Sequence, residues 1–440
     1  MSDVPFQGMR GAGDFLANEE VENWRQGVLR LFPNGMTPLT AITALMGSEA
    51  TTNVIYHWNT KTLPTQRAAI TGVYTNNTLG TAYSGTGGGV IGTVLHLKVA
   101  TEVEAKRFRT GHQVLIRLST DHTIDVTAEV KGIVLNGASS YITVSLLEAD
   151  DNGTVTASQN ISDCDTLLII GNVNADGGTR PTSISYLPTA YQGQCQIFRT
   201  ALDLTRRAMK TTLRTGDAYQ EAKLDALQDH TLEMEKAWLF SQEYTGVGDN
   251  GKPVTTTRGI IPFLKLYAPD NVVDYTQDTD YSGKTWLQGG EQWMDEMIQL
   301  LFKDGNVEGR LVFCGDGALA GINRLVKATG GMTLTPKMTS WGIGVTEWYT
   351  VFGTINLKTH PLFSFEETNR YSMLSIVPQN IKYRYIDDTE FYEDNQYKKG
   401  GGDGKDAISE EWLTDAGLEF HWPTMCGYFN GVGQDNELTA

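Results

Sequence analysis

The sequence lacks the marks of several protein classes. It contains no apolar run of about 18 residues, so we expect no membrane-spanning helix. Its N-terminal segment has no apolar core of the signal-peptide kind, which predicts synthesis in the cytoplasm. Basic residues are outnumbered, 35 against 52 acidic ones, and the net charge is −17. Such a chain is not expected to clamp nucleic-acid phosphates, because those contacts need clustered lysine and arginine.

Cysteine and proline are also scarce. The 440 residues include four cysteines, whose spacing matches no close-spaced metal site. Without a secretory context, we expect them to be small buried hydrophobic residues rather than disulfide partners. They are Cys164, Cys195, Cys314 and Cys426. There are 13 prolines but 47 glycines, and this composition is more typical of flexible loops than of stiff linkers.

One glycine-rich segment resembles a cofactor loop. Gly315–Ala320 fits the dinucleotide pattern G-x-G-x-x-A, after a strand-like run and before a helix-compatible one. However, Asp316 would place a carboxylate where a pyrophosphate should bind, and no acidic strand end follows about 20 residues later. We therefore favour a structural turn. A second match, Gly87–Gly92, lies between a loop and a strand, which is the wrong context.

No other segment indicates catalysis or metal binding. The seven histidines are scattered, and the chain has no P-loop, no G-x-S-x-G and no His-Glu-x-x-His motif. Acidic pairs such as Asp387 and Asp388 lack the residue order of an EF-hand, so we interpret them as solvated surface. We expect no catalytic residues, no cofactor and no metal site.

The first half of the chain divides into three stretches. Residues 1–50 are interpreted as an arm with no domain of its own, helix-compatible over Glu19–Phe32. Residues 51–92 are first extended and then rich in glycine. Between 93 and 172, five or six short alternating strands predict a small barrel or sandwich inserted into the extended region.

The strongest helical pattern follows this insertion. We expect one helical part over Gln194–Leu213 and, after Gly216, a long helix ending near residue 243. The long helix has one apolar stripe, formed by Leu224, Leu227, Thr231, Met234 and Trp238. Basic residues on the first part are interpreted as interface or surface salt-bridge partners. Residues 255–440 have a mixed α/β pattern.

The order of these parts resembles the major capsid proteins of tailed bacteriophages, which share the Hong Kong 97-like fold. The motifs that carry the resemblance are short, and their order is more specific than any one of them. They are Thr37–Thr40, Tyr56–Thr60 with Leu63-Pro64, Tyr191–Phe198, Leu232–Phe240 and Thr257–Ile260.

The resemblance implies an α+β fold with an N-terminal arm, an extended E-loop, a long spine helix, a P-domain and an A-domain, plus the inserted all-β domain. The implied boundaries are the arm at 1–50, the E-loop at 51–92 and 172–193, the insertion at 93–171, the P-domain with its spine helix at 194–254, the A-domain at 255–349, return strands of the P-domain at 350–385, and the A-domain with the C-terminus at 386–440.

The resemblance also implies a function. The chain would self-assemble into hexamers and pentamers of an icosahedral shell enclosing double-stranded DNA without sequence-specific binding. Its partners would be other copies of itself and also portal, scaffold and decoration proteins, with assembly in the host bacterial cytoplasm and no membrane. The expected inter-subunit contacts are Pro38, Leu39, Tyr56, Trp58, Leu63, Arg206, Arg207 and Arg214.

Two alternatives stay open at this point. The same fold also forms the shell of bacterial cargo compartments, which hold no DNA. An α/β nucleotide-binding enzyme would rest on Gly315–Ala320 alone. The content of the particle separates the first alternative from a virion, and a nucleotide-binding assay tests the second.

Overall fold

The computed structural model of the chain contains two compact units. One is built from residues before 61 and after 189, and the other is Lys61–Thr189. The structure describes residues 39, 46–84, 89–122, 124–150, 161–211, 217–303, 305, 309–329, 334–338, 344–365, 367–393 and 407–438. Most of the expected arm, including Glu19–Phe32 and Pro38, therefore lies outside the described residues, as does Arg214.

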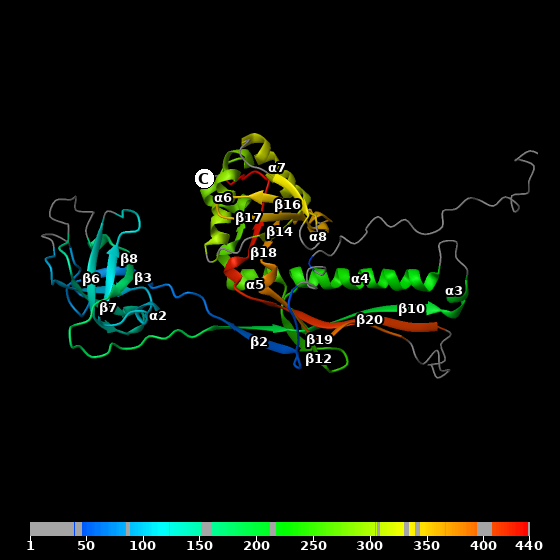
Figure 1. Cartoon of the computed structure of the whole chain (residues 1–440), viewed down its shortest axis with the longest axis horizontal. Coiled ribbons are helices and arrows are strands. Elements are labelled where there is room, and N and C mark those ends of the chain that lie inside the picture. The colour runs from blue at the N-terminus through cyan, green and yellow to red at the C-terminus, as the bar shows by residue number, and fades with distance from the viewer. Residues whose placement is uncertain are drawn as a thin grey trace, which may run out of the picture. The chain divides into compact units, whose positions relative to one another are not determined.

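A long helix packed on a four-stranded sheet forms one part of the first unit. The strand order is β1-β19-β20-β10, with β1 parallel to β19 and the other neighbours antiparallel. Helix α4 runs along β10 and β20 (Figure 1). The bounds are β1 Ser48–Ala50, β10 Gln196–Thr205, α3 Arg206–Lys210, α4 Ala218–Phe240, β19 Ile381–Tyr392 and β20 Ala407–Phe420.

The prediction of a helix over Gln194–Leu213 is wrong. Ten residues of this segment form strand β10, and among its described residues only the five of α3 are helical. Every residue of β10 has an antiparallel partner in β20, more than 200 positions later. This long-range pairing buries Phe198 and Leu202 and outweighs the local helical spacing of the apolar residues.

Helix α4 matches the expected spine helix. It begins after Asp217, whose side chain accepts a hydrogen bond from the Tyr219 N–H and so caps the helix. Its buried face includes Met234 and Trp238 of the expected stripe, but Leu224 is 53% exposed. The polar residues His230 and Glu235 are buried there instead.

A three-layer α/β/α arrangement forms a second part of the first unit. Its seven-stranded sheet has the order β13-β21-β18-β14-β17-β16-β15. Alternating residues of β14 separate two cores, because Val312 and Cys314 pack with helices α6 and α7, whereas Leu311 and Phe313 pack with α4 and α5. The bounds are α5 Ile260–Tyr267, β13 Val272–Asp274, α6 Trp286–Phe302, β14 Arg310–Cys314, α7 Asp316–Thr329, β15 Leu334–Met338, β16 Gly344–Tyr349, β17 Thr354–Thr359, α8 Pro361–Phe365, β18 Met373–Ile376 and β21 Gly427–Asn430.

The expected division of the last 90 residues needs correction. The resemblance implies that residues 350–385 are return strands of the P-domain, but β17 and β18 belong to the seven-stranded sheet. It implies that residues 386–440 belong to the A-domain, but β20 and the part of β19 after residue 385 lie in the four-stranded sheet, and of the described strands in this range only β21 joins the larger one. The sequence marks these segments as strands, whereas only tertiary pairing decides the sheet that each one joins.

Two short pairs of strands complete the first unit. Strand β2, Ile55–Thr60, pairs with β9, Thr189–Gln194. The hairpin of β11, Tyr244–Val247, and β12, Pro253–Thr256, follows helix α4. No described helix of the chain combines the length and the apolar character that crossing a membrane requires.

The second unit is a closed six-stranded β-barrel. Its order is β3-β4-β7-β6-β5-β8, and inward-facing aliphatic residues such as Leu95, Val114 and Val144 fill its core. The bounds are β3 Arg67–Tyr74, β4 Val94–Val99, α2 Glu102–Ala105, β5 His112–Arg117, β6 Asp125–Val134, β7 Tyr141–Leu146 and β8 Thr166–Asn172.

The barrel begins earlier than the sequence suggested. Strand β3 was assigned to the extended loop at 51–92, but it pairs with both β4 and β8 and closes the barrel. The extended connections are correspondingly shorter and cover residues 61–66 and 173–188. All four cysteines are buried free thiols, as expected.

Candidate assembly surfaces

The extended connections start from an anchored root, the β2–β9 pair. Strand β2 alternates strictly, with Tyr56, Trp58 and Thr60 buried and the residues between them exposed. This is the two-residue period of a strand with one face on a core. The buried face of β2 therefore fixes where the chain leaves the first unit.

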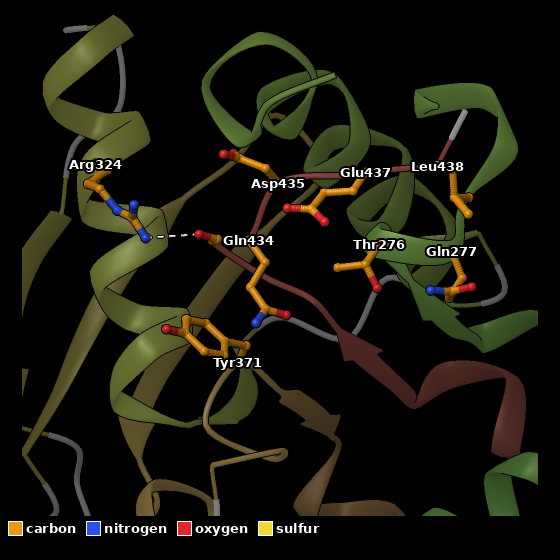
Figure 2. Close-up of a pocket in the computed structure, with 9 residues that line it drawn as sticks. Thr276, Gln277, Arg324, Tyr371, Gln434, Asp435, Glu437 and Leu438 are labelled. Carbon is orange, nitrogen blue, oxygen red and sulfur yellow. Dashed lines mark hydrogen bonds between the residues drawn. The ribbon is translucent and has the colours of Figure 1, made fainter. Parts of the chain in front are cut away.

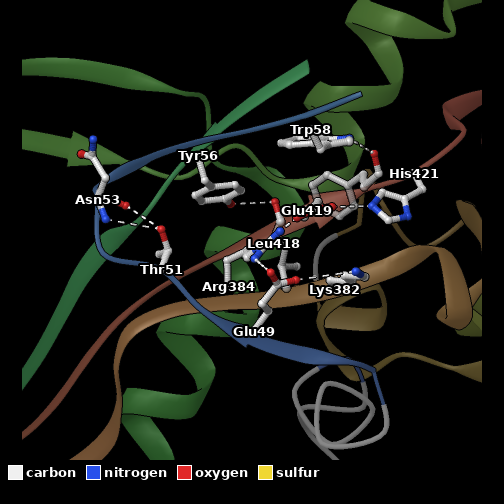
Figure 3. Close-up of polar contacts among 11 residues, drawn as sticks. Glu49, Thr51, Asn53, Tyr56, Trp58, Lys382, Arg384, Leu418, Glu419 and His421 are labelled. Carbon is white, nitrogen blue, oxygen red and sulfur yellow. Dashed lines mark hydrogen bonds and ion pairs between the residues drawn. The ribbon is translucent and has the colours of Figure 1, made fainter. Parts of the chain in front are cut away.

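Aromatic side chains hold this root in place. The Trp58 ring stacks on Tyr56 and Tyr191, with centroids 5.9 and 5.8 Å apart. The Tyr56 hydroxyl donates to the carbonyl oxygen of Leu418 at 2.9 Å, and Trp58 Nε1 donates to that of Phe420 at 3.0 Å (Figure 3). Both carbonyls belong to β20, so the root is attached to the central strand pair of the four-stranded sheet.

A network of ion pairs lies beside the root. Arg384 on β19 contacts Glu49 on β1 at 2.8 Å and Glu419 on β20 at 2.6 Å (Figure 3). His421 Nε2 lies 2.5 Å from the other Glu419 oxygen. Burial by itself would raise the pKa of Glu419, but hydrogen bonds from His421 and Arg384 outweigh it and hold the pKa below its ordinary value. The hydrogen bond from Arg384 and its charge likewise lower the pKa of Glu49.

This network predicts acid sensitivity of the root. Because the folded-state pKa of Glu419 is lowered, its stabilisation is complete above the ordinary glutamate pKa of about 4.3 and is lost as the pH falls through the lowered value. We expect the free energy of unfolding, measured by urea denaturation from pH 7 to pH 3, to fall less steeply in Glu419→Gln than in wild type. Glu233→Gln, an exposed change on α4, is the control and should keep the wild-type slope. Equal slopes for Glu419→Gln and wild type would contradict the prediction.

A fully buried polar cluster joins the end of the arm to the spine helix. Glu235 Oε1 accepts from the Leu39 N–H and from His360 Nε2, each at 2.8 Å. The Leu362 N–H donates to His360 Nδ1 at 3.2 Å, which assigns the imidazole proton to Nε2. Leu39, Glu235 and His360 are each 0% exposed. The cluster thus links three segments that are distant in sequence.

Three of the expected inter-subunit residues are buried inside their own chain. Leu39, Tyr56 and Trp58 are at most 7% exposed and pack into the core of the first unit. The sequence marked them as apolar and close to extended segments, but it did not show that α4, α5 and β20 cover them. Within the single chain, their side chains are therefore covered by the core of the first unit.

The three other expected contact residues that the structure describes lie at the surface. Leu63 is 92% exposed on the first connection, and Arg206 and Arg207 are exposed on α3. Sequence reasoning missed Leu187, which is 90% exposed on the return connection. Its signal was present, because Leu187-Pro188 repeats the Leu63-Pro64 pair. Val351, 99% exposed in the turn between β16 and β17, had no comparable signal.

The glycine-rich segment at 315–320 is packed as a structural turn. The N–H of Gly315 donates to Ser372 O at 3.0 Å and that of Asp316 to Ser364 Oγ at 3.1 Å. The Ala318 N–H donates to Arg370 O at 3.1 Å. Amides that would bind a phosphate are thus engaged within the chain, which supports the turn over the cofactor loop.

Gly315 is a sharp test of this packing. A Cβ at this position would clash with the carbonyl oxygen of Arg370. Gly315→Ala should therefore lower the free energy of unfolding by about 1–3 kcal/mol or more in urea denaturation. Gly47→Ala, whose Cβ would meet nothing within 4 Å, is the matched control. Equal stability of the two variants would contradict the packing argument.

A polar cavity of about 650 Å³ lies where the C-terminal segment crosses α7 (Figure 2). Arg324 donates to the carbonyl oxygen of Gly433 at 2.9 Å. Asp435 Oδ1 accepts from the Trp286 N–H, and the Asn436 amide donates to the carbonyls of Tyr275 and Asp278. These contacts attach the C-terminal segment to α7, to the first residue of α6 and to residues 275–278, so the segment that lines the cavity is held by structural hydrogen bonds.

Comparisons with known proteins place the chain among capsid proteins. A family model described as SU10 major capsid protein matches residues 6–433. A major capsid protein of Pseudomonas phage PaMx41 is 25% identical over 430 residues, covering 94% of this chain and 93% of that protein. A solved structure of Mycobacterium phage Bobi aligns with 94% of this chain and 96% of its own, at 7% identity and a TM-score of 0.41. The holo-SrpI encapsulin complex from Synechococcus elongatus PCC 7942 aligns with 58% of this chain and 79% of its own, at 11% identity and a TM-score of 0.38.

Proposed function

The chain belongs to the SU10 major capsid protein family, and from this membership we propose that its copies form hexamers and pentamers of an icosahedral shell around phage double-stranded DNA. Its role is structural, as a shell subunit of a virion capsid. We place assembly in the cytoplasm of the host bacterium, and we include portal, scaffold and decoration proteins among the partners.

The exposed connections carry this proposal. Leu63 and Leu187 are 92% and 90% exposed, yet they lie on segments that leave an anchored aromatic root. A rigid root with exposed leucines beyond it suits a segment that buries its apolar side chains on another molecule. A lattice of identical subunits supplies such a surface at every position. Leu63, Arg206 and Arg207 remain our candidate contacts, and Leu187 is added to them.

The charge of the chain fits a container for DNA. With a net charge of −17, the subunit repels the phosphate backbone and leaves an enclosed genome free to move. This is the reason that we propose enclosure without sequence-specific binding.

Electron microscopy of the purified, concentrated protein tests the proposal. We expect regular shells, rings of five or six subunits, or tubes in negative stain. Particles purified from infected cells should contain nuclease-protected DNA, whereas shells filled with protein cargo would favour a bacterial compartment. A monodisperse monomer or dimer at every salt and protein concentration would overturn the proposal.

A further inference from the structure

A groove of about 490 Å³ lies between helix α6 and the turn that joins β16 to β17. One wall is acidic and comes from the exposed face of α6, where Glu291 and Asp295 lie one turn apart. The other wall is largely apolar and includes Val351 and Phe352. The groove therefore offers an apolar surface beside negative charge.

The apolar wall is held in a defined conformation. The Thr350 N–H donates to Gly353 O at 3.0 Å, and the Thr350 hydroxyl donates to the same oxygen at 2.6 Å. Gly353 packs on α6, because a Cβ there would lie 2.5 Å from the Phe302 ring. Val351 is thus presented to solvent at 99% exposure by a hydrogen-bonded turn attached to the helix. A fixed apolar side chain loses little conformational entropy when a partner covers it.

The first connection has the complementary chemistry. Residues 61–66 include Lys61 and contain no acidic residue, and Arg67 follows them at the start of β3, in a chain with a large excess of acids. Between these basic residues lies Leu63, at 92% exposure. An extended segment with one apolar side chain and flanking positive charge matches an apolar groove with an acidic wall.

We propose that this groove binds residues 61–66 of a second copy of the chain. Leu63 of one copy packs on Val351 and Phe352 of the next, and Lys61 lies beside Glu291 and Asp295. The contact is heterologous, since two different surfaces meet, and it therefore propagates around a ring of subunits. This inference rests on the proposed shell function and names the surface that receives the connection.

Disulfide trapping tests the contact directly. The double variant Leu63→Cys/Val351→Cys is assembled into shells and then oxidised, and the four buried native thiols keep the background low. We expect a ladder of covalent multimers on non-reducing gels, because each copy would link to the next. The control is Leu63→Cys/Val247→Cys, which places the second thiol on β11, at a residue that is 77% exposed and outside the groove. The control should give at least tenfold less multimer.

Charge exchange provides a second readout. Lys61→Glu, introduced into the trapping variant, should slow cross-linking by about tenfold, and Glu291→Lys with Asp295→Lys should restore it. Lys252→Glu, an exposed change in the β11–β12 turn, should have no effect. Restoration of the rate by the second pair of changes would separate a direct contact from a general loss of folding.

Each other outcome overturns the inference. A link found only within monomers would assign the groove to the connection of its own chain. If the control variant gave the same amount of covalent multimer, the thiols would be meeting by random collision and not through a specific contact. If the double-cysteine variant assembles into shells but forms no link between positions 63 and 351, the groove is rejected and the shell function stays intact. If the wild-type protein forms no shells, both are rejected.

Discussion

Trp58→Ala should destabilise the first unit by about 3–5 kcal/mol and abolish shell assembly. The indole is 7% exposed, stacks on Tyr56 and Tyr191, and donates to the carbonyl oxygen of Phe420. Its removal leaves a cavity at the root and frees β2 from β20. Urea denaturation measures the loss of stability, and electron microscopy measures the loss of shells.

Two further variants make this prediction specific. Trp58→Phe keeps an aromatic ring but loses the Nε1 donor, so it should cost about 1 kcal/mol and retain some assembly. Ile55→Ala changes the exposed face of the same strand, where Ile55 is 41% exposed, and should alter stability by about 0.5 kcal/mol at most. Normal assembly by Trp58→Ala, at wild-type stability, would contradict the role of the root.

Glu235→Ala is expected to cost about 2–6 kcal/mol, because it leaves two buried donors without their acceptor at about 1–3 kcal/mol each. The donors are the Leu39 N–H and His360 Nε2, both 2.8 Å from the same carboxylate oxygen. The loss should also release the end of the arm at Leu39 from α4. Urea denaturation and limited proteolysis near residue 39 measure the two effects.

The controls for this cluster use the same helix. Glu235→Gln retains an oxygen acceptor and should lose less stability than the alanine variant. Glu233→Ala, an exposed change two residues earlier, should be close to neutral. The double variant Glu235→Ala/His360→Phe removes one unsatisfied donor, so it should be less destabilised than the sum of the single changes. Strict additivity would argue against a direct pair.

The sequence was most informative where local signals and structure agree. The helix after Gly216 has a cap at Asp217 and an apolar stripe, and it forms α4 as a single element. The alternating strands after residue 93 form five of the six strands of the barrel, because a two-residue period is typical of any half-buried strand. Family membership, which covers residues 6–433, agrees with the resemblance drawn from the order of short motifs.

The errors arose where distant partners decide the structure. The apolar residues of Gln194–Leu213 have helical spacing, yet residues 196–205 of this segment form a strand because they pair with β20. The sequence predicts a loop where β3 forms, because the partners that make it a strand, β4 and β8, come later in the chain. Secondary-structure signals act over a few residues, whereas these pairings depend on contacts between parts that meet only in the folded chain.

The candidate contact surface shows the same division. The order of the parts, the charge of the chain and the presence of apolar residues near the extended segments can be read from the amino-acid sequence. Which of these residues are exposed depends on the folded chain, because Tyr56 and Trp58 are covered by the core while Leu63 is left exposed. Burial depends on which element packs over a side chain, and that element comes from elsewhere in the sequence. For this reason the types and order of the residues predict a protein that assembles, but the surfaces available for assembly depend on how the chain packs.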